Sequence, residues 1–509
     1  MKSTATVGSM TLLSRIFGLI RDIVIARAFG ADVGTDAFFV AFRIPNFFRR
    51  LFGEGAFAQA FVPVLTEYKE QRDEEQVRNL IDHTTATLAL ILIAVTLIGI
   101  VAAPIVILGF APGFSGDGGR YELAVSMLQL TFPYLLFISL TALAGAILNA
   151  YRQFAVPAFT PVLLNLAMIA AAIWWAPYFE RPIIALAWGV LLAGVVQLLF
   201  QLPFLLKLRR LPRPFKGRDK EGVKRIFKLM LPTLFGVSVA QINTIVDTLM
   251  ASFLVSGSIS WLYYSDRMME FPLGVFGIAL ATVILPQLSE KHSQGNSADY
   301  SATLDWGLRL VWLVCLPAAL GLALLAGPIM VTLFQYGSFT PGDAAMAARS
   351  LMAFALGLPA FVLIKVLASA FFSRQDTKTP VKAGVAAMLT NIVLNLALIQ
   401  ALAHVGLALA TSIAAMVNAG LLYVWLQRSG AFQSQSGWGV FALRIAIAAI
   451  VMTALLIYYV PAIDHWVNLD LWQRVLQLTA WVLAGALLYP LVLLIAGLRL
   501  RHFRGQGAN

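Results

Sequence analysis

The stretch SRIFGLIRDIVIARAFG, residues 14–30, has the length and apolar content of a membrane-spanning helix, yet it carries charges. It contains Arg15, Arg21, Asp22 and Arg27 among its apolar side chains. Each charge near the centre of a bilayer costs roughly 2.5–3.5 kcal/mol on insertion scales. These side chains must therefore face water, one another or a ligand, and the rest of the chain has to provide such an interior.

The composition of the whole chain is that of a polytopic membrane protein. Of 509 residues, 60% are hydrophobic and 12% charged, and the mean hydropathy is +0.81. Soluble proteins carry about 25% charged residues. The single cysteine, Cys315, excludes an internal disulfide, and the five histidines lack metal-ligand spacing. The net charge of +12 does not indicate a nucleic-acid partner, because it lies in loops, where it sets topology.

The apolar segments predict an all-α fold of fourteen transmembrane helices. A span needs about 20 mostly apolar residues, and such segments lie near 5–29, 36–64, 85–111, 122–149, 157–178, 183–206, 226–255, 262–288, 303–335, 344–372, 380–401, 405–427, 438–460 and 471–498. The loop Lys207–Lys228 holds ten Lys or Arg and two acidic residues, which predicts a cytoplasmic position. Loops 256–260 and 464–470, on the opposite side, hold no Lys or Arg. An even number of spans places both termini in the cytoplasm.

Two pairs of short motifs indicate an internal repeat. VPVLTEYK (62–69) is similar to LPQLSEK (285–291), and YRQFAVP (151–157) is similar to SRQDTKTP (373–380), at nearly the same separation. The alternative is that short loop motifs recur by chance. The repeat predicts two six-helix lobes in the same orientation, a parallel pseudo-repeat, plus two extra C-terminal helices. The expected divisions are an N-lobe at 1–206, a basic cytoplasmic linker at 207–225, a C-lobe at 226–427 and the last two spans with the tail at 428–509.

The charges of the first two spans fall on definite helix faces. At about 100° per residue, Arg15 and Asp22 share a face, because seven residues make nearly two turns. On an ideal second helix Asp36, Arg43, Arg50 and Glu54 also share a face. Arg49 falls off it, but Pro45 should kink this helix and could re-aim the side chain.

Further charges lie in the eighth and tenth spans, as Asp266, Arg267, Glu270 and Lys365. Arginine dominates the set, and arginine binds phosphate bidentately while staying charged. The pattern therefore predicts a water-filled cationic cavity for an anionic substrate, a phosphate or a diphosphate. The alternative interpretation is that buried ion pairs simply join helices.

Three blocks carry a family resemblance. SRIFGLIRD (14–22), TDAFFVAFRIPNFFRRLFGEGAFAQAFVP (35–63) and WLYYSDRMMEFP (261–272) closely resemble the MurJ/MviN family of lipid II flippases, within the multidrug/oligosaccharidyl-lipid/polysaccharide exporter superfamily. The resemblance runs along essentially the whole chain. It implies a substrate, lipid II, that is moved from the cytoplasmic to the periplasmic leaflet of the bacterial inner membrane for peptidoglycan synthesis, by alternating access.

The resemblance also implies which residues contact substrate. Matching the family's motif, the cavity residues are Arg15, Arg21, Asp22, Asp36, Arg49, Glu54 and Arg267, and the charge pattern adds Lys365. The family favours Arg49 where the helical projection favours Arg50. Spans 13 and 14 resemble the pair that forms a groove for the lipid tail. Membrane lipids and other cell-wall synthesis proteins are the expected partners besides lipid II.

The energy source has two candidates. No GxxxxGK[ST] motif is present, so we expect no ATP hydrolysis by the chain itself. Asp247, Asn391, Asn395 and Thr411 resemble a sodium site of some family members, but that site has an acid where Asn395 stands. Membrane potential or protons are the alternative, and ordinary interhelical hydrogen bonding would also explain these residues. No other cofactor is expected.

The charges within the spans distinguish a lipid II flippase from other possible functions. A cation-coupled drug exporter should line its cavity with acids instead of arginines. A flippase for another undecaprenyl-diphosphate-linked glycan would use the same diphosphate contacts and remains an alternative. An enzyme would need a nucleophile or clustered carboxylates, and neither pattern is present, so we expect no catalytic activity. A structural scaffold would not need a charged interior.

Overall fold

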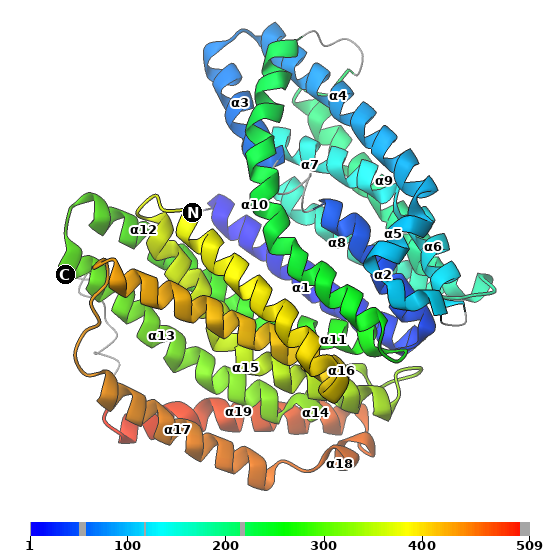
Figure 1. The fold of residues 1–509 in the computed structure, drawn as a ribbon. Helices are drawn as coiled ribbons and strands as arrows, with labels where there is room; N and C mark the ends of the chain where they lie inside the picture. Colours follow the sequence, from blue (N-terminus) through cyan, green and yellow to red (C-terminus); the bar gives the residue numbers. More distant parts are fainter. Residues whose placement is uncertain (1, 50–56, 117–118, 214–218, 499–509) are drawn as a thin grey trace. The chain divides into compact units, whose positions relative to one another are not determined.

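The structure is helical throughout the part of the chain that it describes. The computed structural model describes residues 2–49, 57–116, 119–213 and 219–498, and every regular element in those ranges is a helix (Figure 1). Ten of these helices are long and apolar enough to cross a membrane. The expected all-α, multi-pass class is therefore confirmed.

The ten apolar helices differ from the fourteen expected segments for local reasons. Helix α1 (Lys2–Phe29) is long, but charged side chains interrupt its apolar sequence. Helix α2 (Val33–Phe48) has 16 residues before the described chain is interrupted. Helix α16 (Lys378–Arg428) has 51 residues and contains two expected segments, which meet at Ala403. There φ is 48° and ψ is −129°, so the helix direction changes.

The chain divides by its internal packing into two units, of which the first comprises Met1–Ser260 and Tyr336–Phe339. In this unit α1 packs on α8, α2 on α6, and α7 on both α4 and α9. The helices after α2 are α3 (Ala58–Gln71), α4 (Glu74–Val101), α5 (Ala103–Phe110), η2 (Pro112–Gly116), α6 (Arg120–Thr131), α7 (Tyr134–Ala150), α8 (Ala155–Ala170), η3 (Ala171–Trp175), η4 (Ala176–Tyr178), α9 (Ile184–Lys207) and α10 (Lys220–Ser252).

Helix α10 packs within the first unit, although the sequence repeat assigns it to the second lobe. It contacts α3, α4 and α5. Near its start Arg225 forms a bidentate ion pair with Glu67 of α3, at 2.7 and 2.8 Å. The Asp219 side chain caps the helix by accepting from the Gly222 amide at 2.8 Å. The division into lobes that the repeat suggests stays a prediction.

The second unit comprises Trp261–Gln335 and Thr340–Asn509. Helices α13, α15 and α16 enclose its larger apolar core, and α17 and α19 add a second core against α13. The elements that form it are α11 (Ser258–Pro272, of which Ser258–Ser260 count with the first unit), η5 (Leu273–Gly277), α12 (Ile278–Ser293), α13 (Ser297–Leu324), α14 (Ala326–Phe334), α15 (Pro341–Phe372), α16, α17 (Trp438–Tyr459), α18 (Ile463–Val467) and α19 (Leu471–Ile495).

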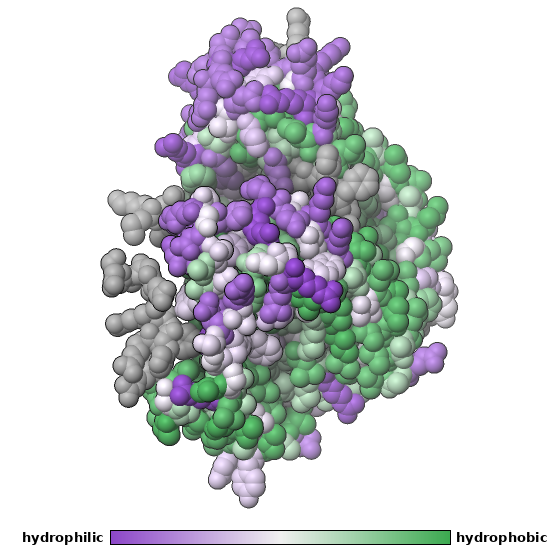
Figure 2. All heavy atoms as spheres, turned by 60° about the vertical axis from the view of Figure 1, so that its left-hand side comes forward, coloured by the Kyte–Doolittle hydropathy of each residue, from purple (hydrophilic) through white to green (hydrophobic). Residues whose placement is uncertain are grey.

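The surface shows the apolar exposure expected of a protein in lipid. Figure 2 shows broad areas of hydrophobic side chains, with hydrophilic side chains gathered at the top of the view, where Figure 1 has the α3–α4 turn and the start of α10. Large apolar side chains such as Ile98, Val101 and Ile105 are 67–81% exposed. In water such exposure would be costly, whereas hydrocarbon accepts it.

Candidate functional site

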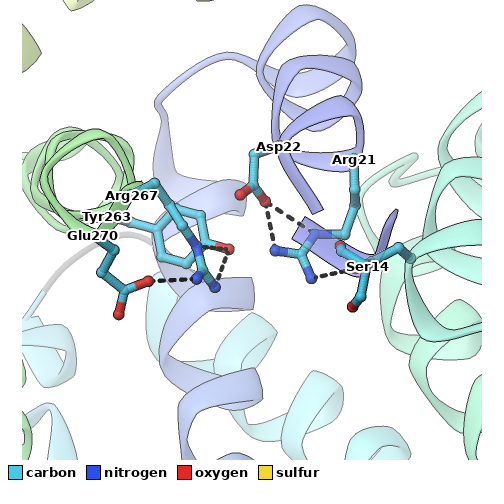
Figure 3. Close-up of polar contacts among 7 residues, drawn as sticks. Ser14, Arg21, Asp22, Tyr263, Arg267 and Glu270 are labelled. Carbon is cyan, nitrogen blue, oxygen red and sulfur yellow. Dashed lines mark hydrogen bonds and ion pairs between the residues drawn. The ribbon is translucent and has the colours of Figure 1, made fainter. Parts of the chain in front are cut away.

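A buried polar group lies on α1, as the first sequence stretch requires. Arg21 and Asp22 are 5% and 1% exposed. The Asp22 Oδ1 accepts from Arg21 Nε at 2.9 Å and from Nη2 at 2.6 Å (Figure 3). The two charges therefore neutralise each other, which reduces the cost of holding them within an apolar bundle.

Asn165 of α8 completes this group. Its Oδ1 accepts from Arg21 Nη1 at 3.0 Å, and its Nδ2 donates to the Ser14 carbonyl at 3.1 Å. A Cβ added at Gly18 would lie 3.7 Å from Asn165 Nδ2, so the small residue lies opposite the amide. The guanidinium of Arg21 is thus held from two sides, by Asp22 of its own helix and by an amide of α8. Arg15 lies on the same helix and is half-buried.

Asp36 has a role in the turn between α10 and α11. The side chain is fully buried. Its Oδ2 accepts from the Gly257 amide at 2.8 Å, and its Oδ1 accepts from the Ser260 amide and hydroxyl at 2.9 and 2.7 Å. These bonds satisfy backbone donors where α11 begins, in the manner of a helix cap supplied from another helix. In this structure Asp36 therefore orders residues 257–260.

The remaining candidates of the second span are only partly described. Arg49 is the C-terminal cap residue of α2, and its Nε donates to Asn46 Oδ1 at 3.0 Å. Glu54 and Arg50 lie outside the described residues. Arg43 donates from Nη1 to the Thr248 hydroxyl of α10 at 2.6 Å. This arginine contacts a neighbouring helix in the first unit.

In the second unit, Arg267 of α11 is held by two side chains of its own helix. Its Nη1 forms an ion pair with Glu270 Oε2 at 2.8 Å. The Tyr263 hydroxyl accepts from Nη2 and Nε at 3.3 and 3.4 Å, and the guanidinium carbon lies 5.2 Å from the Tyr263 ring centroid (Figure 3). Unlike Arg21, this arginine is 36% exposed. The Arg267 guanidinium is therefore both held in one orientation and accessible from outside the protein.

Lys365 of α15 lies beside the π-helical segment η5. A Cβ added at Gly277 would come within 2.9 Å of Lys365 Cδ. The glycine therefore leaves room for the aliphatic part of this lysine, which is half-buried.

The residues of the expected sodium site are partly brought together. Asn391 Nδ2 donates to the Thr411 hydroxyl at 3.3 Å, and Asn395 Nδ2 donates to Asn391 Oδ1 at 3.1 Å. Asp247 belongs to α10 in the first unit and is half-buried. Across the described ranges, no group of three or more His, Cys, Asp or Glu is arranged to hold a metal ion. The Asn391–Asn395–Thr411 group supplies neutral oxygens alone.

Two residues of these groups were not expected from the sequence. Asn165 interrupts the apolar run AVPAFTPVLLNLAMIA, so an isolated amide within a span was the available signal. Tyr263 precedes the charged run of α11 and reads as an ordinary apolar residue of the span. Only the helical spacing of four residues from Arg267 could have indicated the contact.

The fold and these groups together define a class of protein. Many apolar helices, with arginine–carboxylate pairs inside otherwise apolar segments, are the features of a multi-pass membrane transporter, because intramembrane charge is retained where it serves a substrate path. Comparison with known proteins narrows the class. Residues 25–476 match the family model described as lipid II flippase MurJ. The chain belongs to the MurJ family of lipid II flippases.

Individual relatives agree with this assignment. A protein of Vibrio cholerae described as a probable lipid II flippase MurJ is 49% identical over 511 residues, covering 99% of this chain and 97% of that protein. A solved structure of lipid II flippase MurJ in an inward closed conformation is 28% identical, with a TM-score of 0.81 and 98% of each chain covered. An inward-facing MATE family multidrug transporter of the MOP superfamily is 14% identical, with a TM-score of 0.68 over 84% of this chain and 98% of that one, and this likeness concerns the fold alone.

Proposed function

We propose that this protein is a flippase that moves lipid II from the cytoplasmic to the periplasmic leaflet of the bacterial inner membrane. The observation that carries the proposal is membership of the lipid II flippase family over nearly the whole chain. The protein then acts in peptidoglycan synthesis as a transporter and performs no bond-making step.

Alternating access through a cationic central cavity is the mechanism that we propose. A disaccharide-peptide head is too polar to cross hydrocarbon, and its diphosphate is the group that arginines bind best. The partly exposed Arg267 supports this idea, since Glu270 and Tyr263 orient its guanidinium before substrate arrives. Arg21 and Asp22, which pair with each other in this structure, join the proposed path through the family resemblance. We include Arg15, Asp36, Arg49, Glu54 and Lys365 in the same proposed substrate path.

The proposed topology has fourteen spans with both termini in the cytoplasm. The ten long apolar helices support it when α16, one of the ten, is counted as two arms and α1, α2 and α10 are added. The distribution of Lys and Arg among the loops gives the orientation. Within this scheme residues 428–509 supply spans 13 and 14, which we assign to the polyprenyl tail. Exposed apolar side chains along α17 and α19, among them Ile450, Leu487 and Ile495, support contact with an apolar chain.

For the resetting step we propose dependence on a sodium ion or on membrane potential. The group Asn391, Asn395 and Thr411 offers neutral oxygens, and a sodium site would also require Asp247. The two energy sources are separated by replacing sodium with choline in the medium while the membrane potential is held constant. Lipid II transfer should slow only if it is coupled to sodium.

The proposal is tested in cells depleted of the protein, with a probe that reaches only the outer-leaflet precursor. Wild-type protein should restore lipid II in the outer leaflet. Arg21→Ala and Arg267→Ala should not restore it, and the total lipid II of those cells should rise. Arg181→Ala, which alters an exposed arginine of the first unit, is the matched control. A normal outer-leaflet pool after depletion would contradict the function, and a rise in another polyprenyl-linked glycan would identify a different substrate. Full restoration by both alanine variants would contradict the cationic cavity.

A further inference from the structure

A buried arginine at the start of α19 has no place in the proposed substrate path. Arg474 is 5% exposed. It donates to five backbone carbonyl oxygens: from Nε to Trp466 and Leu469, both at 3.0 Å, from Nη1 to Val331 and Gln335 at 3.3 and 3.2 Å, and from Nη2 to Val467 at 2.8 Å. A single guanidinium therefore joins three segments of the second unit.

The carbonyls around Arg474 lie at helix ends. Val331 and Gln335 belong to the last turn and cap of α14, and Trp466 and Val467 end the short helix α18. The last carbonyls of a helix lack intrahelical donors and carry its partial negative charge. The Val331 and Trp466 carbonyls already accept from the Gln335 and Leu469 amides, both at 3.3 Å. The guanidinium therefore adds charge-assisted bonds at the negative ends of both helices, and it attaches the start of α19 to α14.

A second charged group lies at the start of α17. Asp305 of α13 is 3% exposed, and its Oδ1 accepts from the Trp438 indole at 2.7 Å and from the Gln435 amide at 3.1 Å. Arg309 Nε bonds to Asp305 Oδ2 at 2.7 Å, and Nη2 donates to the Ser436 carbonyl at 2.8 Å. The Arg309 guanidinium also lies 5.1 Å from the Trp438 ring. This group attaches the start of α17 to α13.

An apolar seam joins these two groups. The buried side chains Phe441, Ile445, Ala448 and Met452 of α17 pack with Tyr489 and Leu493 of α19, together with partly buried side chains of α13. Helices α17 and α19 lie antiparallel, because the chain turns back between them through α18 (Figure 1). The start of α17 and the start of α19 therefore lie at opposite ends of the pair. Apolar packing alone would let the pair slide, since hydrocarbon is an equally good neighbour within a membrane.

We infer that Arg474 and the Asp305–Arg309–Trp438 group are positioning residues that fix the α17–α19 pair to α13 and α14 at both ends, so that the pair forms a stationary surface for the apolar tail of the substrate. The inference rests on the proposed function for its substrate. By this inference Arg474, Asp305 and Arg309 align the surface that the substrate tail contacts. They are distinct from the arginines that would bind the diphosphate.

The test compares substrates that differ only in tail length. Purified protein in vesicles is given lipid II with an undecaprenyl tail and an analogue with a farnesyl tail. Arg474→Met and Asp305→Asn should slow transfer of the long-tailed substrate by about tenfold, the effect of one strong polar contact, with little change for the short one. A general loss of stability would slow both substrates alike, and that result would overturn the inference, as would unchanged transfer of both.

A spectroscopic readout tests the attachment without any transport. Spin labels are attached at two exposed positions, Met352→Cys of α15 and Leu487→Cys of α19. The native cysteine is removed by Cys315→Ala. The distance distribution should be narrow in the otherwise unchanged protein, broaden in Arg474→Met and Asp305→Asn, and stay narrow in Arg428→Met, an exposed arginine of the same unit. Unbroadened distances would overturn the inference. If the protein without the Arg474 and Asp305 substitutions transfers neither substrate, the proposed function fails. The spin-label distances still decide whether the α17–α19 pair is fixed.

Discussion

At the scale of single residues, the arginines within the spans are distinguished by their surroundings. Arg21 is buried and held by Asp22 and Asn165, Arg267 is partly exposed beside Glu270 and Tyr263, and Arg474 is enclosed by carbonyls. The same residue type thus has three different environments. Burial with carbonyl partners fits a structural role, whereas partial exposure beside an orienting tyrosine fits contact with an anion.

The Tyr263 hydroxyl gives a prediction at this scale. Tyr263→Phe removes the oxygen that accepts from Arg267 but keeps the ring beneath the guanidinium. We expect lipid II transfer to fall about fivefold, since such a hydrogen bond contributes about 1 kcal/mol, with thermal stability nearly unchanged. Tyr264→Phe is the control, because that ring packs against Phe334, 5.1 Å away, instead of Arg267. An equal loss in both variants would assign Tyr263 to packing.

At the scale of elements, helix α16 shows how one residue decides a connection. Its two arms meet at Ala403, which has a positive φ that non-glycine residues seldom adopt. Just beyond it, Gly406 allows the backbone to approach Leu398 closely. The two predicted spans thus fold back through a tight turn without an intervening loop.

Gly406 therefore provides a stability prediction. A Cβ at this position would lie 2.7 Å from the Leu398 carbonyl oxygen, and backbone cannot yield as a side chain can. Gly406→Ala should destabilise the protein by about 1–3 kcal/mol, measured by thermal unfolding in detergent. Gly420→Ala, in the same helix with no atom within 4 Å, should be neutral or slightly stabilising. Equal unfolding temperatures for the two variants would contradict this account.

The ion pair between α3 and α10 predicts a pH dependence. The hydrogen bonds from Arg225 lower the pKa of Glu67 below its ordinary value of 4.5. A lowered folded-state pKa gives stability that is present above 4.5 and is lost as the pH falls through the folded-state value. Wild type should therefore unfold at a slightly higher temperature than Glu67→Gln at neutral pH, and the difference should disappear in acid. A difference that grew in acid would show that the pair does not stabilise the contact.

At the scale of the whole molecule, the proposed topology rests on the number of spans and on loop charge, and it can be tested. The proposed topology of fourteen spans, with the basic loops inside, predicts that residue 378 lies in the cytoplasm and residue 468 outside. In intact cells a membrane-impermeant thiol reagent should label Asn468→Cys, and it should reach Lys378→Cys only after permeabilisation. Both positions are exposed, and the native Cys315 is buried. Labelling of Lys378→Cys from outside would reverse the orientation.

The sequence by itself determined the class of the protein. Apolar segments of membrane length depend on local composition, which is why the all-α, multi-pass class could be predicted directly. The family was predicted from the resemblance of three motif blocks, and the chemical type of the proposed site stays a prediction. The resemblance supplied the choice of Arg49 over Arg50, because Pro45 makes an ideal helical projection unreliable.

Tertiary structure alone decided which side chains meet. The contacts of Arg21 with Asn165, of Asp36 with residues 257–260, and of Arg474 with the ends of α14 and α18 join segments far apart in the chain. Nothing in the local sequence encodes them, because helical periodicity fixes the face of a side chain and not the neighbour that the face will contact. The packing of α10 in the first unit was hidden for the same reason, since packing depends on which apolar faces fit together.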